Sequence, residues 1–149
     1  MDRREDLAKR EAESWTAFLT EVEAVPSERR SVEGVVPGWT VKDLVHHCGG
    51  WAGFSADQLE AIGNGTFKDP FDDVPDEHWD RVSQEMIEES RRMRFEEVLQ
   101  GAEEARARAR SVWGALPAVS DDAARFFSEE TFEHYQEHRA EIQAFRERG

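Results

Sequence analysis

The sequence has very little cysteine, a shortage of positive charge and no apolar run long enough to span a membrane. Among 149 residues, Cys48 is the one cysteine, which excludes an intramolecular disulfide framework and fits a reducing cytoplasm. Lys and Arg number 19 against 33 Asp and Glu, so the formal net charge is −14. Because this field repels polyphosphates and acidic headgroups, we expect neither nucleic acid nor a membrane surface as a partner.

Signals for strands and for secretion are also scarce. No segment alternates apolar and polar residues over the length of a strand, and Asn64-Gly65 follows Gly63, which indicates a helix end rather than a hairpin. The N-terminal residues MDRREDLAKREAES are charged and lack an apolar core of the kind found in signal peptides. A cytoplasmic protein is therefore expected.

What the sequence does contain is helical periodicity. Apolar residues make up 38% of the chain and include five Trp and nine Phe, which is enough for one sizeable core and a single domain over residues 1–149. The spacing predicts a first helix over 4–24 and a second from Thr40 to about Ile62, opened by Thr40 as N-cap with Asp43 in a capping box.

The second half of the chain predicts two further helical regions. A charged region begins near Asp76, breaks around 92–95 and ends at Pro117, and Ser120 caps a short turn. Ser128 is interpreted as the cap of a last helix over about 129–148. Helices with one apolar face each, joined by short and medium loops, predict an all-α, antiparallel four-helix bundle.

The most informative residues are three histidines. His134 and His138 are four residues apart and share a helix face with Ile142, so both lie on the apolar stripe of the last helix. On the second helix, His47 lies about 60° from the apolar residue Leu44, whereas His46 lies about 160° away and is expected to face water.

Three inward-facing imidazoles suit a borderline divalent metal such as zinc or nickel. Two ligands from one helix and one from a facing helix leave coordination positions open, as a catalytic centre requires. The alternative is that each histidine is a hydrogen-bonded core residue without a metal, which is common for a histidine on an apolar face.

Two segments resemble a known family. Residues 38–47, GWTVKDLVHH, resemble the GWTVKD…H signature of the DinB-like superfamily, which includes the maleylpyruvate isomerase N-terminal domain, bacillithiol transferases and the ClbS/DfsB-like branch. Residues 131–142 resemble the HYxEH helix of the same superfamily. The resemblance implies a bundle with an up-down-down-up connection and a divalent metal bound by His47, His134 and His138.

The resemblance also implies two classes of function. The first is a metal-dependent S-transferase or hydrolase that acts on an electrophilic small molecule, with a low-molecular-weight thiol as a cofactor of the transferase. The second is a metal-free protein of the ClbS/DfsB kind that sequesters or inactivates a reactive metabolite. In either case a small-molecule ligand is expected, and a homodimer through one helical face is a further expectation.

Several residues near the histidines have two interpretations. Glu130, Glu141 and Tyr135 are candidates for supporting a metal ligand or lining a pocket, or else belong to a charged bundle edge or the packed interior. Cys48 is interpreted as a small buried hydrophobe. The tryptophans Trp39, Trp51 and Trp79 belong to the core or to an aromatic-walled cavity over the metal.

Overall fold

The computed structural model describes residues 2–149, which contain six α-helices, one short 3₁₀ turn and no strand, so the all-α prediction is confirmed. The elements are α1 (Arg3–Ala24), the 3₁₀ turn η1 (Ser27–Arg29), α2 (Val41–Asn64), α3 (Asp76–Arg91), α4 (Phe95–Ala115), α5 (Asp121–Glu130) and α6 (Phe132–Glu147). None of these helices combines the length and apolar character that crossing a bilayer requires.

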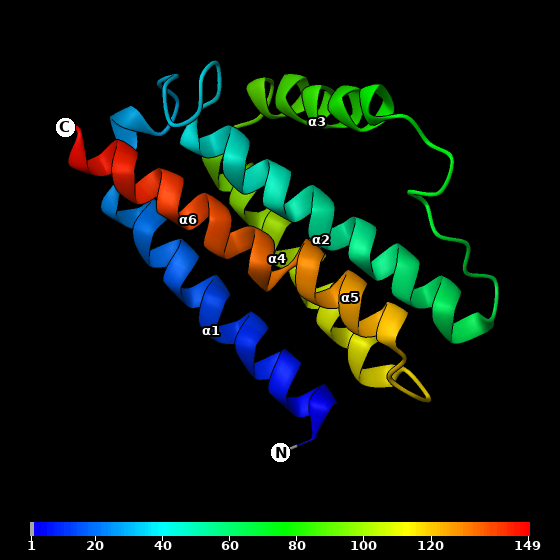
Figure 1. Ribbon diagram of the computed structural model, residues 1–149. Coiled ribbons are helices and arrows are strands. Elements are labelled where there is room, and N and C mark those ends of the chain that lie inside the picture. Colours follow the sequence, from blue (N-terminus) through cyan, green and yellow to red (C-terminus); the bar gives the residue numbers. More distant parts are fainter. Residues whose placement is uncertain (1) are drawn as a thin grey trace.

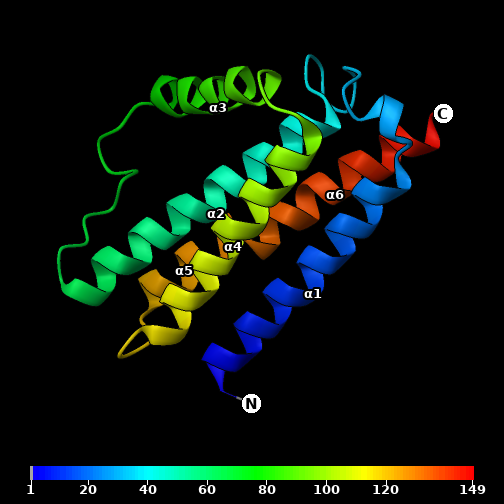
Figure 2. The ribbon, with the colours of Figure 1, turned by 180° about the vertical axis from the view of Figure 1, so that it is seen from behind.

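The long helices lie alongside one another. α1 packs along α6, and α2 packs along α4 and contacts α5 (Figure 1). α5 and α6 follow each other almost in line and run in the same direction as α1, whereas α2 and α4 run the opposite way (Figures 1 and 2). This arrangement sets α2 opposite α6, which is where the three histidines are found.

The start of α2 follows the predicted capping box. The Thr40 hydroxyl accepts a hydrogen bond from the Asp43 backbone N–H at 3.0 Å, and the Asp43 carboxylate accepts one from the Thr40 N–H at 2.9 Å. These two bonds satisfy donors that a helix N-terminus otherwise leaves free. The helix ends at Gly65, whose φ of 79° suits glycine.

The last helical region differs from the prediction. Ser120 caps the ten-residue helix α5 rather than a short turn, and Ser128 lies inside α5 and caps nothing. The helix breaks instead at Thr131, and α6 begins at Phe132. The reason is tertiary packing: the Phe127 ring stacks on Trp113 of α4 with centroids 4.4 Å apart, which stabilises helix in a segment that the capping signals divide elsewhere.

Helix α3 crosses the outer side of α2 and corrects the expectation for His46. α3 packs mainly against α2 (Figure 1). The His46 side chain is only 17% exposed, and its Nε2 lies 3.4 Å from a carboxylate oxygen of Glu89 on α3. His46 does lie on the side of α2 away from the core, as its angle to Leu44 predicts, but α3 covers that side.

Candidate metal centre

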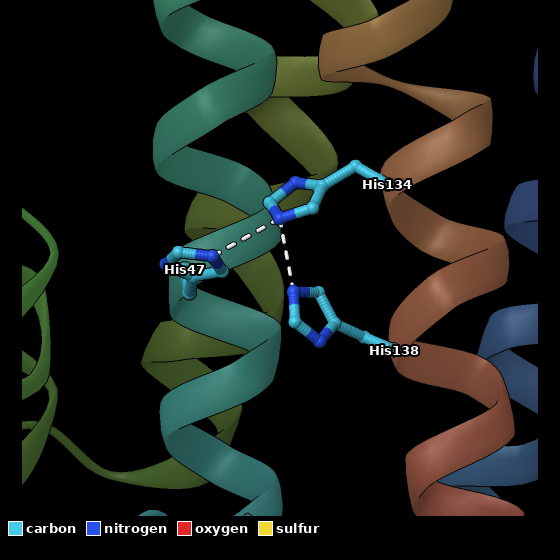
Figure 3. Close-up of side chains that lie close together, drawn as sticks. All are labelled: His47, His134 and His138. Atoms are coloured by element: carbon cyan, nitrogen blue, oxygen red, sulfur yellow. Dashed lines mark hydrogen bonds between the residues drawn. The ribbon is translucent and has the colours of Figure 1, made fainter. Parts of the chain in front are cut away.

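Three histidines from two helices meet at one point. His47 projects from α2, and His134 and His138 project from successive turns of α6 (Figure 3). The Nε2 atom of His134 lies 3.0 Å from Nε2 of His47 and 2.9 Å from Nε2 of His138. Residues predicted from helical spacing to face each other are thus brought within reach of a single ion.

Aromatic rings and burial shield this cluster from water. His47 is 6% exposed and His138 is 8% exposed. The Trp39 ring contacts His47 edge-on at a centroid distance of 5.0 Å, and Trp51, one turn further along α2, lies at 6.3 Å. A buried polar cluster of this kind requires partners for its nitrogen atoms.

Neutral imidazoles alone do not satisfy this arrangement. Nδ1 of His138 donates its proton to the Glu141 carboxylate, so Nε2 of a neutral His138 presents a lone pair to the cluster. The single Nε2 of His134 faces both other Nε2 atoms, and one proton on it serves only one of the two contacts. At least one nitrogen pair is therefore left without a proper hydrogen bond in every neutral assignment.

Protonation does not solve the problem. Burial, together with the neighbouring histidines, lowers the pKa of His47 to about 3. The same causes lower the pKa of His134 to about 2. Both of these rings are accordingly neutral at physiological pH, and a cation between the Nε2 atoms would match the lone pairs that converge there.

The geometry fits such a cation. A four- or six-coordinate ion with metal–nitrogen bonds of about 2.1 Å holds adjacent nitrogens about 3.0 to 3.4 Å apart, close to the two Nε2 separations of the cluster. In addition, the Nδ1 atoms of His47 and His134 are buried without a hydrogen-bond partner among residues 2–149. The three-histidine cluster can therefore hold a metal ion.

The three supporting candidates lie in different surroundings. Glu141 contacts His138 directly. Tyr135 points away from the cluster, because its hydroxyl donates to Glu11 of α1 at 3.0 Å and its ring packs against Trp15. Glu130 is the last residue of α5, four residues before His134, and burial, reinforced by Glu129, raises its pKa to about 7.

The remaining candidates divide between core and site. Cys48 is fully buried, and burial raises its pKa far above the ordinary value, as expected for a small hydrophobe. Trp79 reaches Trp51 with centroids 5.7 Å apart and so belongs to the aromatic surroundings of His47. No pattern in the sequence predicts that Phe54, Phe71 and Phe126 lie near the aromatic rings around His47. The one relevant observation in the sequence is that the loop before α3 contains aromatic residues.

Comparison with known proteins gives one family. The family model described as the mycothiol maleylpyruvate isomerase N-terminal domain matches residues 12–130. The match includes His47 and ends before His134 and His138, so the grouping of the last two with His47 comes from the geometry. Neither the curated proteins nor the solved structures include a match to this chain.

Proposed function

Because the chain belongs to the mycothiol maleylpyruvate isomerase N-terminal domain family, within the DinB-like superfamily, we propose that it is a metal-dependent enzyme acting on an electrophilic small molecule. Its metal ligands are His47, His134 and His138. The observation that carries the proposal is the convergence of three Nε2 atoms that neutral imidazoles cannot satisfy among themselves. The reaction is transfer of a thiol to the electrophile or its hydrolysis.

The chain's own residues prepare the centre for this chemistry. A divalent ion supplies a Lewis acid that makes a thiol or water nucleophilic near neutral pH. Glu141 fixes the ring of His138 so that Nε2 faces the ion, and Trp39 excludes water beside His47. We assign to Glu130, which ends α5 four residues before His134 and has its pKa raised by burial to about 7, the role of accepting the proton that the nucleophile releases.

The proposal also covers the metal, the co-substrate, the helix connection, the location and the partners of the chain. Three neutral imidazoles favour zinc or nickel, and the family favours a low-molecular-weight thiol as co-substrate. The helix directions support the up-down-down-up connection of a four-helix bundle. The single cysteine supports a cytoplasmic location, and the net charge of −14 argues against a nucleic-acid partner. We also propose that the chain forms a homodimer.

Elemental analysis of the purified full chain tests the centre. After loading with Zn²⁺ or Ni²⁺ and removal of excess ion, we expect one ion per wild-type chain and loss of that ion in His47→Ala and in His134→Ala. Unchanged stoichiometric metal in both variants would rule this site out.

Two other histidines provide matched controls. His46→Ala removes the neighbouring ring that contacts Glu89, and His78→Ala removes an exposed ring, so both should keep the metal. Chelator treatment then separates the two functional classes. Loss of activity with the chelator and its return with the ion support the enzyme, whereas ligand binding that persists in the metal-free chain supports the metal-free protective protein.

A further inference from the structure

A group of aromatic rings continues from the histidines along α2 to α5 and to the segment before and at the start of α3. We define the aromatic cluster as Trp51, Phe54, Phe71, Trp79 and Phe126. Trp51 contacts His47 on one side and Phe54, with centroids 4.9 Å apart, on the other. The Phe71 and Phe126 rings are stacked at 5.9 Å. The cluster is therefore continuous with the candidate metal centre.

The helix register places this cluster directly beside the centre. Along α2, His47 is followed by Trp51 and then Phe54. On α5 and α6, which run the opposite way (Figure 1), His134 is preceded in the chain by Glu130, the last residue of α5, and by Phe126. The Ser55 hydroxyl donates to the Phe126 carbonyl at 3.0 Å and fixes this alignment.

The outer rings of the cluster come from the loop before α3 and from the start of α3. Phe71 is 36% exposed and belongs to the loop between α2 and α3, and Trp79 lies in the first turn of α3. The Trp79 indole N–H is buried without a hydrogen-bond partner among residues 2–149. A ligand with an acceptor at this point would offset the cost of that unpaired donor.

Charges around the cluster select against an anionic ligand. The Glu141 carboxylate contacts His138. The cation placed against the cluster is Arg125, whose guanidinium is 4.6 Å from the Phe126 ring centroid. Arg125 already donates to Asp69 at 2.9 Å and to Asp122 at 3.3 Å. An acidic group of a substrate would thus meet carboxylates and a cation that is already paired.

We propose that the substrate of this centre carries an uncharged aromatic ring, which packs against Trp51 and Trp79 while the reacting group lies at the histidines. This proposal rests on the proposed function, because it places the ring relative to a metal held by His47, His134 and His138. It adds the substrate class: flat, apolar and without a carboxylate near the ring.

Metal-binding azoles on the Co²⁺-loaded full chain test the proposal. Imidazole, 4-phenylimidazole and 4-(imidazol-4-yl)benzoate all bind an ion through the azole, and changes in the visible Co²⁺ absorption report their affinities. Because the phenyl ring leaves water on binding, we expect 4-phenylimidazole to bind about ten- to a hundredfold more tightly than imidazole. The benzoate should bind no more tightly than imidazole.

Variants of the aromatic cluster test whether its rings cause the preference for 4-phenylimidazole over imidazole. Phe71→Ala and Trp79→Ala should reduce the ratio of 4-phenylimidazole affinity to imidazole affinity at least threefold. Phe95→Leu, which changes a ring outside the aromatic cluster, should keep the wild-type ratio. Phe71 is partly exposed, so its variant remains informative if Trp79→Ala does not fold. Equal affinity for all three azoles, or tightest binding of the benzoate, would overturn the aromatic-ring proposal alone. A wild-type chain that takes up no Co²⁺ would overturn the proposed function and this inference with it.

Discussion

The carboxylate of Glu141 accepts the Nδ1 proton of His138 one turn earlier on α6, and this contact directs the lone pair of His138 Nε2 towards His134 and His47. Glu141 is half-buried at the edge of the cluster. Carboxylates in this position fix the tautomer and orientation of a ligating imidazole and raise its basicity. The pair therefore links a surface carboxylate to the affinity of the candidate metal centre.

Replacing Glu141 should weaken metal binding without abolishing it. In Glu141→Gln the amide is a poorer acceptor for the His138 Nδ1 proton, so we expect the affinity for Zn²⁺ to fall about 10- to 100-fold. Competition with a chromophoric chelator measures the change. Glu137→Gln removes an exposed carboxylate one turn before Glu141 and should bind the ion as the wild type does. Equal losses in both variants would indicate a general charge effect instead.

The inward faces of the three histidines were predictable because they follow from helix periodicity, and the resemblance to the DinB-like superfamily grouped the three residues. The spacing of His134 and His138, and the angle between His46 and His47, depend only on the 100° rotation per residue. The aromatic cluster was not predictable to the same degree. Phe71 reaches Phe126 through an irregular loop whose path no periodic pattern encodes.

The same distinction applies to the helices themselves. The bounds of α1 and α2 follow from strong apolar stripes and from the capping box of Thr40 and Asp43. The break at Thr131 does not, because Ser128 followed by two glutamates is an equally good local start. Packing of Phe127 on Trp113 decides between the two, and such a contact between distant segments is not visible in local sequence.

Gly49 should be essential for the close approach of α2 and α4. A Cβ atom at this position would lie 2.8 Å from the Ala102 Cα, and the α4 backbone cannot move away locally. We expect Gly49→Ala to lower the free energy of unfolding by about 1–3 kcal/mol. At Gly53, on the same helix, the nearest atom to an added Cβ is 3.9 Å away. Gly53→Ala should therefore stabilise by up to about 1 kcal/mol, and chemical denaturation compares the two.

Glu11 should contribute strongly to stability because it is a fully buried carboxylate shared by three helices. It accepts hydrogen bonds from Arg106 at 2.9 Å and Arg110 at 3.0 Å on α4, and from Tyr135 on α6. Glu11→Ala leaves these donors unpaired, so we expect a loss of about 3 kcal/mol in urea denaturation.

Glu23 is exposed near the end of α1 and makes no side-chain ion pair within residues 2–149. Glu23→Ala is therefore the control for the loss of stability in Glu11→Ala. A loss below about 1 kcal/mol for Glu11→Ala would contradict the assigned importance of the network.

Glu130 should give the metal-free protein a stability that declines between pH 4.5 and pH 7. Burial holds the native carboxyl protonated up to a pKa of about 7, whereas the unfolded carboxyl ionises near 4.5. Between these values the native state binds more protons than the unfolded state, so this group's contribution falls as the pH rises. The Glu130→Gln variant lacks this titrating carboxyl. Its free energy of unfolding should therefore rise relative to that of the wild type as the pH increases from 4.5 to 8. Denaturation at both pH values in the presence of chelator measures the gain, and exposed Glu133→Gln should show none. A Glu130→Gln difference that is the same at both pH values would mean that Glu130 ionises normally in the folded chain and does not accept the nucleophile's proton near neutral pH.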